Sequence, residues 1–113
     1  MPRPNFIELP SRDLAASRRF FEAAFDMNLT AFGPTYACTL TGDVDIGLQA
    51  DPAEMTRAPL PVIQVEDLEA TLAAVTAAGA KVTRPIFSFP GGRRFHFVEP
   101  GGNELAAMQA APE

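Results

Sequence analysis

The sequence repeats itself once, and this repeat restricts the possible folds more than any other feature. Asp13-Leu14 follows the apolar stretch Phe6–Leu9, and Asp67-Leu68 follows the apolar stretch Leu60–Val65, so the two aspartates lie 54 positions apart. In a chain of 113 residues, that spacing is nearly half the length. Each copy continues as an amphipathic helix and short strands separated by glycine and proline. The repeat predicts two modules of the form βαβββ.

Local signals place the elements of each module. The aspartates at 13 and 67 are good N-caps, because a carboxylate accepts hydrogen bonds from the free N–H groups of a first helical turn. They predict helices over 14–25 and 68–78, and Gly79 stands where a left-handed C-cap is expected. Besides the strands at 5–9 and 60–65, we expect strands at 27–31, 36–40, 44–49, 81–86, 93–98 and 103–108. Pro85 is expected to break the strand 81–86, and Phe87 and Phe89 either form a mobile rim or, as we slightly favour, pack on an edge strand.

The length fits one domain over residues 1–113. Within it we expect a first module at about 4–50, a connection at 51–59 that is rich in proline, acids and small residues, and a second module at about 60–109. One such module cannot cover its own sheet. We therefore predict an α+β fold in which two modules form an open, curved, mostly antiparallel sheet, with helices on one face and a concave cleft on the other.

Charge and composition exclude several functions. With 9 basic and 14 acidic residues and a net charge of −5, the chain lacks the basic footprint of a nucleic-acid binder and is not suited to anionic membranes. We find no apolar stretch long enough to span a bilayer and no secretion signal, so we expect a cytoplasmic protein. The single cysteine, Cys38, excludes an internal disulfide and a thiolate metal site, and is expected to be a small core residue.

Several segments resemble the vicinal oxygen chelate superfamily, the group of glyoxalase I, extradiol dioxygenases and bleomycin-resistance proteins. The resemblance covers about residues 5–109. The matching segments are Phe6–Pro10, Asp13-Leu14, Phe20-Phe21, Phe25, Val65–Leu68, Ala78–Val82 and the ending Phe97–Leu105, which reads FVEPGGNEL. The resemblance implies the same two-module fold and a small-molecule cleft, but not one particular activity.

The resemblance also implies where a metal would bind. Members with a metal take one ligand from the first strand and one from the last strand of each module, and these positions fall on Phe6, Gly47, Leu60 and Ala106. None of the four can donate to a divalent ion. The neighbouring register is no better, since it offers Ile7, Ile46 or Leu48, Pro61, and Leu105 or Ala107. We therefore expect no metal and no other cofactor.

The alternation of side chains along each strand predicts which residues line the cleft. On the helix-covered face we expect Ile7, Leu9, Ile46, Leu48, Ile63, Val65, Phe95, Phe97, Leu105 and Ala107. On the concave face we expect Phe6, Glu8, Asp45, Gly47, Gln49, Leu60, Val62, Gln64, Arg94, His96, Glu104, Ala106 and Met108. The candidate ligand-binding residues are Phe6, Glu8, Gln49, Leu60, Gln64, His96, Glu104 and Met108. The alternative is that this surface is only the solvated face of a sheet.

The roles of the titratable candidates stay open. His96, the only histidine, can be a general acid or base, a lone metal ligand, a plain ligand contact or a half-exposed strand residue without a role. Glu8 and Glu104 either act as a carboxylate pair across the cleft or lie on the surface, where they are solvated or form a salt bridge, for example with Arg94. With His96, the two glutamates would also make a displaced metal site. The sequence assigns no catalytic residue.

Three classes of function fit these observations. The favoured one is a metal-free protein of the bleomycin-resistance kind, which binds a small aromatic or cationic compound in an acidic, partly apolar cleft. The second is a glyoxalase- or dioxygenase-like enzyme, either with atypical metal ligands or with acid/base catalysis by Glu8, Glu104 or His96. The third is a structural or regulatory module without a pocket. We expect a homodimer, as in related two-module proteins and because open sheet edges need cover, with a monomer as the alternative.

Overall fold

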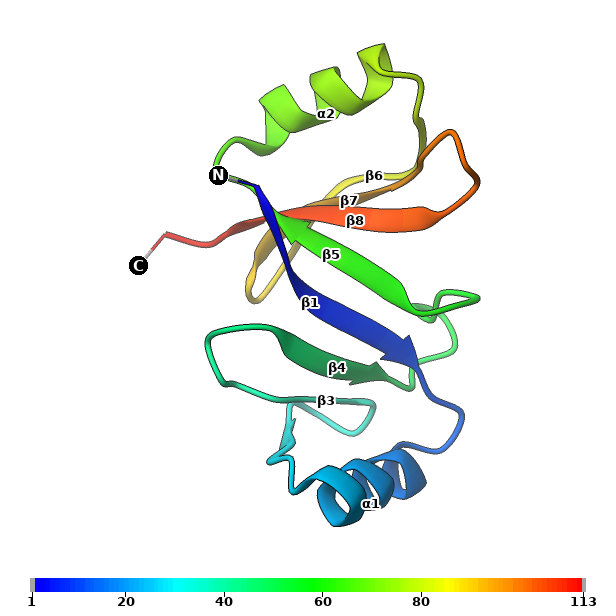
Figure 1. Cartoon of the computed structure of the whole chain (residues 1–113), viewed down its shortest axis with the longest axis vertical. Coiled ribbons are helices and arrows are strands. Elements are labelled where there is room, and N and C mark those ends of the chain that lie inside the picture. The colour runs from blue at the N-terminus through cyan, green and yellow to red at the C-terminus, as the bar shows by residue number, and fades with distance from the viewer. Residues whose placement is uncertain (1, 113) are drawn as a thin grey trace. The chain divides into compact units, whose positions relative to one another are not determined.

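The computed structural model describes residues 2–112 and divides the chain into two units. We call Phe6–Leu60 the N-terminal module. The C-terminal module holds the residues from Pro61 onward together with the beginning of the first strand. Each module has one helix and four strands (Figure 1). None of the helices in residues 2–112 has the length and apolarity needed to cross a membrane.

The two modules share one topology. The first contains β1 (Arg3–Pro10), α1 (Leu14–Phe25), β2 (Thr30–Ala31), β3 (Tyr36–Cys38) and β4 (Asp45–Gln49), with strand order β2-β3-β4-β1. The second contains β5 (Leu60–Gln64), α2 (Leu68–Ala77), β6 (Lys81–Phe89), β7 (Gly92–Val98) and β8 (Glu104–Ala110), with order β5-β8-β7-β6. β1 pairs with β4 and β5 with β8 in parallel, and all other pairs within the modules are antiparallel. The α+β class and the two βαβββ modules are confirmed.

Both helices begin where the sequence predicts. The Asp13 carboxylate accepts a hydrogen bond from the Ala16 N–H at 3.0 Å, and Asp67 accepts from Ala70 at the same distance. Each bond satisfies one of the free donors of a first turn. Gly79 follows α2 with φ +102°, as predicted for a left-handed residue. After α1 the left-handed residue is an aspartate, Asp26, with φ +55°.

The strand β6 departs from its prediction at a proline. β6 does not stop at Ile86 near Pro85 but runs on to Phe89, so Phe87 and Phe89 are strand residues. β6 is the outer strand of its module, where a proline without an N–H costs least. Its pairing with β7 shifts register between Val82 and Arg84 and again between Arg84 and Phe87. These irregularities carry the strand past Pro85.

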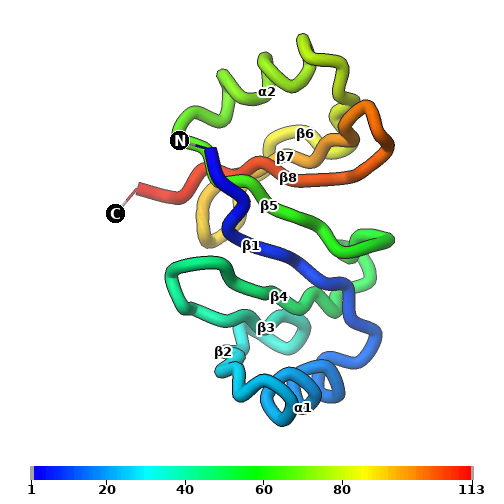
Figure 2. The backbone as a smooth tube through the Cα atoms, in the orientation of Figure 1, coloured from blue at the N-terminus to red at the C-terminus, as the bar shows by residue number. Residues whose placement is uncertain are grey.

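Each helix covers one face of its own sheet, as Figure 2 shows for α2 over β6, β7 and β8. The C-terminal core contains Val65, Leu68, Phe95, Phe97 and Ala107. The N-terminal core contains Leu29, Ala37 and Leu48, with Leu9, Leu14, Phe21 and Ile46 packed against it. Except for Ile7, which is exposed, the residues expected on the helix-covered face belong to these two cores.

Cys38 is buried, as expected, and burial raises the pKa of its thiol above the ordinary value, with Asp45 adding to the effect.

Candidate functional site

The register of the C-terminal module brings its polar candidates to one face. Gln64 pairs with Met108, and Met108 with Arg94. Two residues away on each strand, Ala106 of β8 pairs with His96 of β7. Paired residues point to the same side of a sheet, and this side is opposite to the face that packs on α2. We call this surface, centred on His96 in β7, the His96 face.

Two residues that the sequence analysis did not select also lie on this face. The register places Arg84 opposite His96 and Phe87 opposite Arg94. The guanidinium carbon of Arg84 lies 3.6 Å from the centroid of the Phe87 ring, and that of Arg94 lies 5.4 Å from it. Alternation alone could not find them, because the register shifts in β6 move its residues out of phase.

His96 is buried among these groups, with 3% of its surface exposed. Its Nδ1 lies 3.7 Å from a carboxylate oxygen of Glu104, and the Phe87 ring centroid lies 5.7 Å from the imidazole. Its other nitrogen, Nε2, is fully buried and finds no hydrogen-bond partner in residues 2–112. Buried polar atoms in native proteins almost always have a partner, so this nitrogen calls for one, such as an ordered water or a bound molecule.

Burial lowers the pKa of His96 from 6.5 to about 4, with the positive charge of Arg94 acting in the same direction. Arg84 adds to this effect, whereas the Glu104 carboxylate opposes it. The imidazole is therefore neutral at physiological pH. With Nδ1 facing the carboxylate, the favoured tautomer keeps its proton on Nδ1 and leaves the Nε2 lone pair as an acceptor.

The remaining polar candidates of this module are held by neighbours. Glu104 is about one-third exposed and accepts a hydrogen bond of 2.9 Å from the Thr83 hydroxyl. The side-chain oxygen of Gln64 accepts a hydrogen bond from the Asn5 amide. Such contacts fix the two side chains and reduce the entropy lost when a ligand binds.

The N-terminal module carries the other candidates. Register places Glu8 beside Gly47, with Phe6 and Gln49 on the same side of the sheet. Glu8 is buried, with 2% exposed, and accepts a hydrogen bond of 3.4 Å from the Tyr36 hydroxyl. The Gln49 side chain accepts from the backbone N–H of Asp51, so it braces a loop.

The residues at the four family metal positions do not fit a metal. Phe6, Gly47, Leu60 and Ala106 carry no donor side chain, and Leu60 and Ala106 are fully buried. The space above Gly47 is also filled: a Cβ added there would meet the Tyr36 hydroxyl and lie 2.5 Å from Cζ of Phe6. Residues 2–112 contain no group of three or more His, Cys, Asp or Glu side chains that could hold an ion. No reaction step through a metal follows from this chain.

Comparison with known proteins identifies the family of this chain. The model of the Glyoxalase/Bleomycin resistance protein/Dioxygenase superfamily matches residues 3–107. The chain belongs to this superfamily, which confirms the resemblance found in the sequence. No curated protein sequence matches the chain.

Solved structures show the same fold at low sequence identity. A glyoxalase/bleomycin resistance protein/dioxygenase superfamily member from Vibrio splendidus is 19% identical with a TM-score of 0.74, and the match covers 96% of this chain and 99% of that one. Methylmalonyl-CoA epimerase from Mycobacterium tuberculosis is 14% identical with a TM-score of 0.75, covering 96% and 88%. The Mn(II)-bound glyoxalase from Novosphingobium aromaticivorans is 19% identical with a TM-score of 0.71, covering 96% of this chain but 40% of that chain.

Proposed function

We propose that this chain is a metal-independent binding protein of the bleomycin-resistance kind, and that its small organic ligand contacts the His96 face. The observation that carries the proposal is the buried Nε2 of His96 without a partner among residues 2–112. A ligand atom that donates to it would remove the cost of an unsatisfied buried acceptor, about 1–3 kcal/mol. Met108 and Phe87 offer apolar contact beside it.

The same geometry indicates the chemistry of the ligand. Nε2 accepts a hydrogen bond, so the ligand carries an O–H or N–H donor next to an apolar or aromatic surface. The net charge of −5 favours a cation within the predicted class of small aromatic or cationic compounds. On this face Arg84 and Arg94 already depress the pKa of His96, which argues for a neutral or anionic compound instead.

Binding is favoured over acid/base catalysis by the pKa of His96. A group with a pKa of about 4 is a weak base near neutral pH and is not in the protonated imidazolium form that acts as an acid, whereas an efficient acid/base catalyst titrates near the working pH. The enzyme alternative, with atypical metal ligands or with Glu8, Glu104 or His96 as acid or base, keeps its support from the likeness to an epimerase and a glyoxalase.

A screen of small phenols and aromatic amines by thermal shift tests this function, with His96→Gln as the variant and Arg19→Gln, an exposed change on α1, as the matched control. We expect the compounds that stabilise the wild type and Arg19→Gln to fail with His96→Gln. Equal stabilisation of all three proteins would place the ligand elsewhere. Near one equivalent of Zn, Ni, Mn or Fe retained after gel filtration would contradict metal independence.

We further propose that the protein is a cytoplasmic homodimer. The support is the superfamily membership together with an apolar surface on the N-terminal module, where Phe20, Phe25 and Phe32 are each more than half exposed. Burying such a surface against a second copy removes it from water. Sedimentation at micromolar concentration should give twice the monomer mass of 12.1 kDa, and a monomer mass throughout would reject the dimer.

A further inference from the structure

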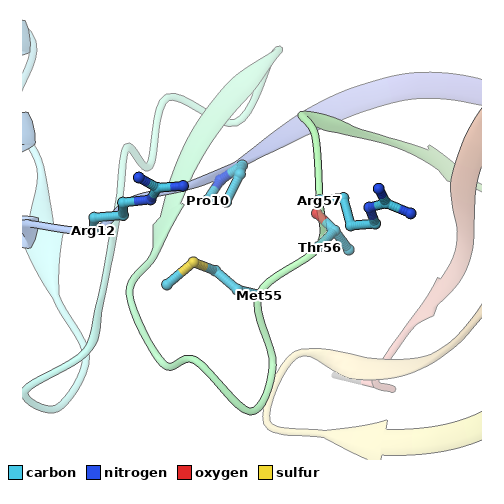
Figure 3. A pocket seen from close by; sticks show the side chains of 5 residues that line it. All are labelled: Pro10, Arg12, Met55, Thr56 and Arg57. Carbon is cyan, nitrogen blue, oxygen red and sulfur yellow. The ribbon is translucent and has the colours of Figure 1, made fainter.

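A pocket lies within the N-terminal module, and none of its lining residues belongs to the His96 face. Its walls are Pro10 at the end of β1, Arg12 before α1, and Met55, Thr56 and Arg57 in the segment after β4 (Figure 3). Its volume is about 390 Å³, which is within the range of pockets that hold small metabolites. Figure 3 shows Arg12 and Arg57 on opposite sides of Pro10, with Met55 below.

Hydrogen bonds hold both walls of this pocket in place. Ser11, next to Arg12, is buried, donates its N–H to the Gln49 carbonyl at 2.9 Å and shares a hydrogen bond of 2.7 Å with the Ser17 hydroxyl. On the other wall the N–H of Met55 donates to the Asp51 carbonyl at 2.9 Å. The pocket is therefore formed by ordered segments, which lowers the cost of binding.

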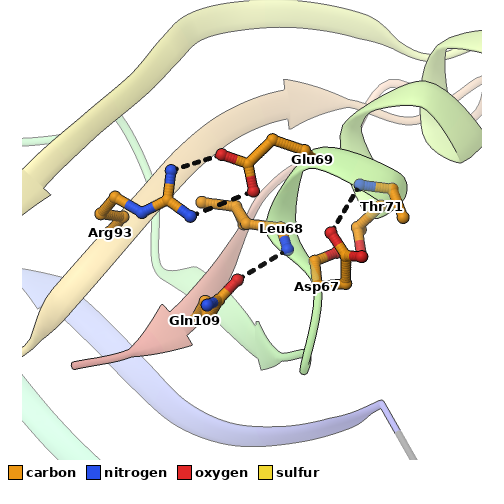
Figure 4. Close-up of polar contacts among 7 residues, drawn as sticks. Asp67, Leu68, Glu69, Thr71, Arg93 and Gln109 are labelled. Carbon is orange, nitrogen blue, oxygen red and sulfur yellow. Dashed lines mark hydrogen bonds and ion pairs between the residues drawn. The ribbon is translucent and has the colours of Figure 1, made fainter. Parts of the chain in front are cut away.

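The two arginines of the pocket make no hydrogen bond or ion pair with any described residue. The acids near them in sequence are occupied, since Asp13 accepts from Ala16 and Asp51 accepts from Ala53. Arg93 shows the contrasting case, with two hydrogen bonds to Glu69 at 2.5 and 3.0 Å (Figure 4). An acidic chain thus places two guanidiniums without partners around one pocket.

We infer that this pocket binds a small organic anion, with a carboxylate or phosphate group on Arg12 or Arg57 and an apolar body against Met55 and Pro10. Guanidinium groups match both kinds of anion through paired N–H donors. The Thr56 hydroxyl already donates its hydrogen to the Ala58 carbonyl at 2.7 Å. The hydrogen bonds to the anion therefore come from the arginines. This site is independent of the function proposed for the His96 face.

Calorimetric titration with succinate and with glycerol 3-phosphate tests the inference, at constant ionic strength and with neutral succinamide as the uncharged analogue. We expect saturable binding of at least one anion and none of succinamide. Succinate alone would identify a carboxylate site, and glycerol 3-phosphate alone a phosphate site. The substitution that removes the anion-binding arginine, Arg12→Gln or Arg57→Gln, should weaken binding by about tenfold or more, since it removes a charge-assisted contact.

Arg19→Gln serves as the control, because Arg19 is an exposed arginine of α1 outside the pocket, and it should bind like the wild type. Absence of saturable binding of both anions at millimolar concentrations would overturn the inference. So would equal affinity in a double variant that carries Arg12→Gln and Arg57→Gln. If a variant fails to fold, an NMR titration of the wild type with each anion tests the inference instead. The amide chemical shifts that change on addition of the anion must then centre on Arg12, Met55 and Thr56.

Discussion

The neutral, buried state of His96 leads to a prediction about stability and pH. A histidine with a pKa of about 4 in the folded chain and 6.5 in the unfolded chain binds its proton more weakly when folded. Above pH 6.5 both states are neutral and the group contributes no pH dependence. As the pH falls from 6.5 to 4, the unfolded chain gains the proton first, so the free energy of unfolding decreases.

The size of this effect follows from the two pKa values. Each pH unit in this window costs up to about 1.4 kcal/mol, so the free energy of unfolding should fall by about 2 kcal/mol between pH 7 and pH 5, and by about 3 kcal/mol at pH 4. For a domain with a stability of about 5–15 kcal/mol this is a large share. Because His96 is the only histidine, no other side chain of its type contributes.

Urea unfolding at pH 7, 6 and 5 measures the effect, with His96→Gln as the comparison. The wild type should lose stability over this range, while His96→Gln should change little. Protonation of carboxylates also lowers the free energy of unfolding, but mainly nearer pH 4. The reason is that hydrogen bonds lower the pKa of Glu69, which accepts from Arg93, and of Glu99, which accepts from the Gly101 N–H. An NMR titration of the one imidazole gives an independent reading: a midpoint near 6.5 instead of 4 would refute the reasoning.

Two further predictions concern the sheet faces. Gly47→Ala should destabilise the fold by about 1–2 kcal/mol, because the new methyl group meets Phe6 and Tyr36, and a Phe6→Leu background should relieve part of this loss in a double-mutant cycle. Leu105→Gln should cost about 2 kcal/mol because it places an amide against the core, whereas Glu104→Gln should stay within about 0.5 kcal/mol and lower the pKa of His96 further. Urea unfolding measures both pairs, and the reverse order for Leu105 and Glu104 would mean that β8 faces the other way.

Much of the fold could be predicted because its signals are local. Each of the repeated aspartates caps its helix by accepting a hydrogen bond from the backbone N–H three positions later in the sequence. This geometry depends on no distant contact. Alternation assigned the faces of β4, β7 and β8 correctly, since strand register has a strict period of two. Strand lengths were less accurate: β2 has two residues where five were expected, because pairing partners decide where a strand ends.

The candidate site could be predicted only in part. His96, Glu104, Gln64 and Met108 lie on one face of the C-terminal module as expected, whereas a binding role for Phe6, Glu8, Gln49 and Leu60 stays a prediction. Arg84 was missed because two register shifts around Pro85 break the alternation that would have placed it. The pocket of the N-terminal module was missed because a strand end and a loop, distant in sequence, form it together.

Net charge is a poor guide to the ligand of this chain, because many of its acids serve the backbone. Asp13 and Asp67 cap helices. Asp45 accepts hydrogen bonds from the loop before it, and Glu99 accepts from the turn between β7 and β8. A carboxylate engaged in this way is already partnered, and its field is screened by water at the surface. Beside His96 the positive charges of Arg94 and Arg84 shift a pKa, so the ligand charge that we propose follows from this local arrangement and not from the total of −5.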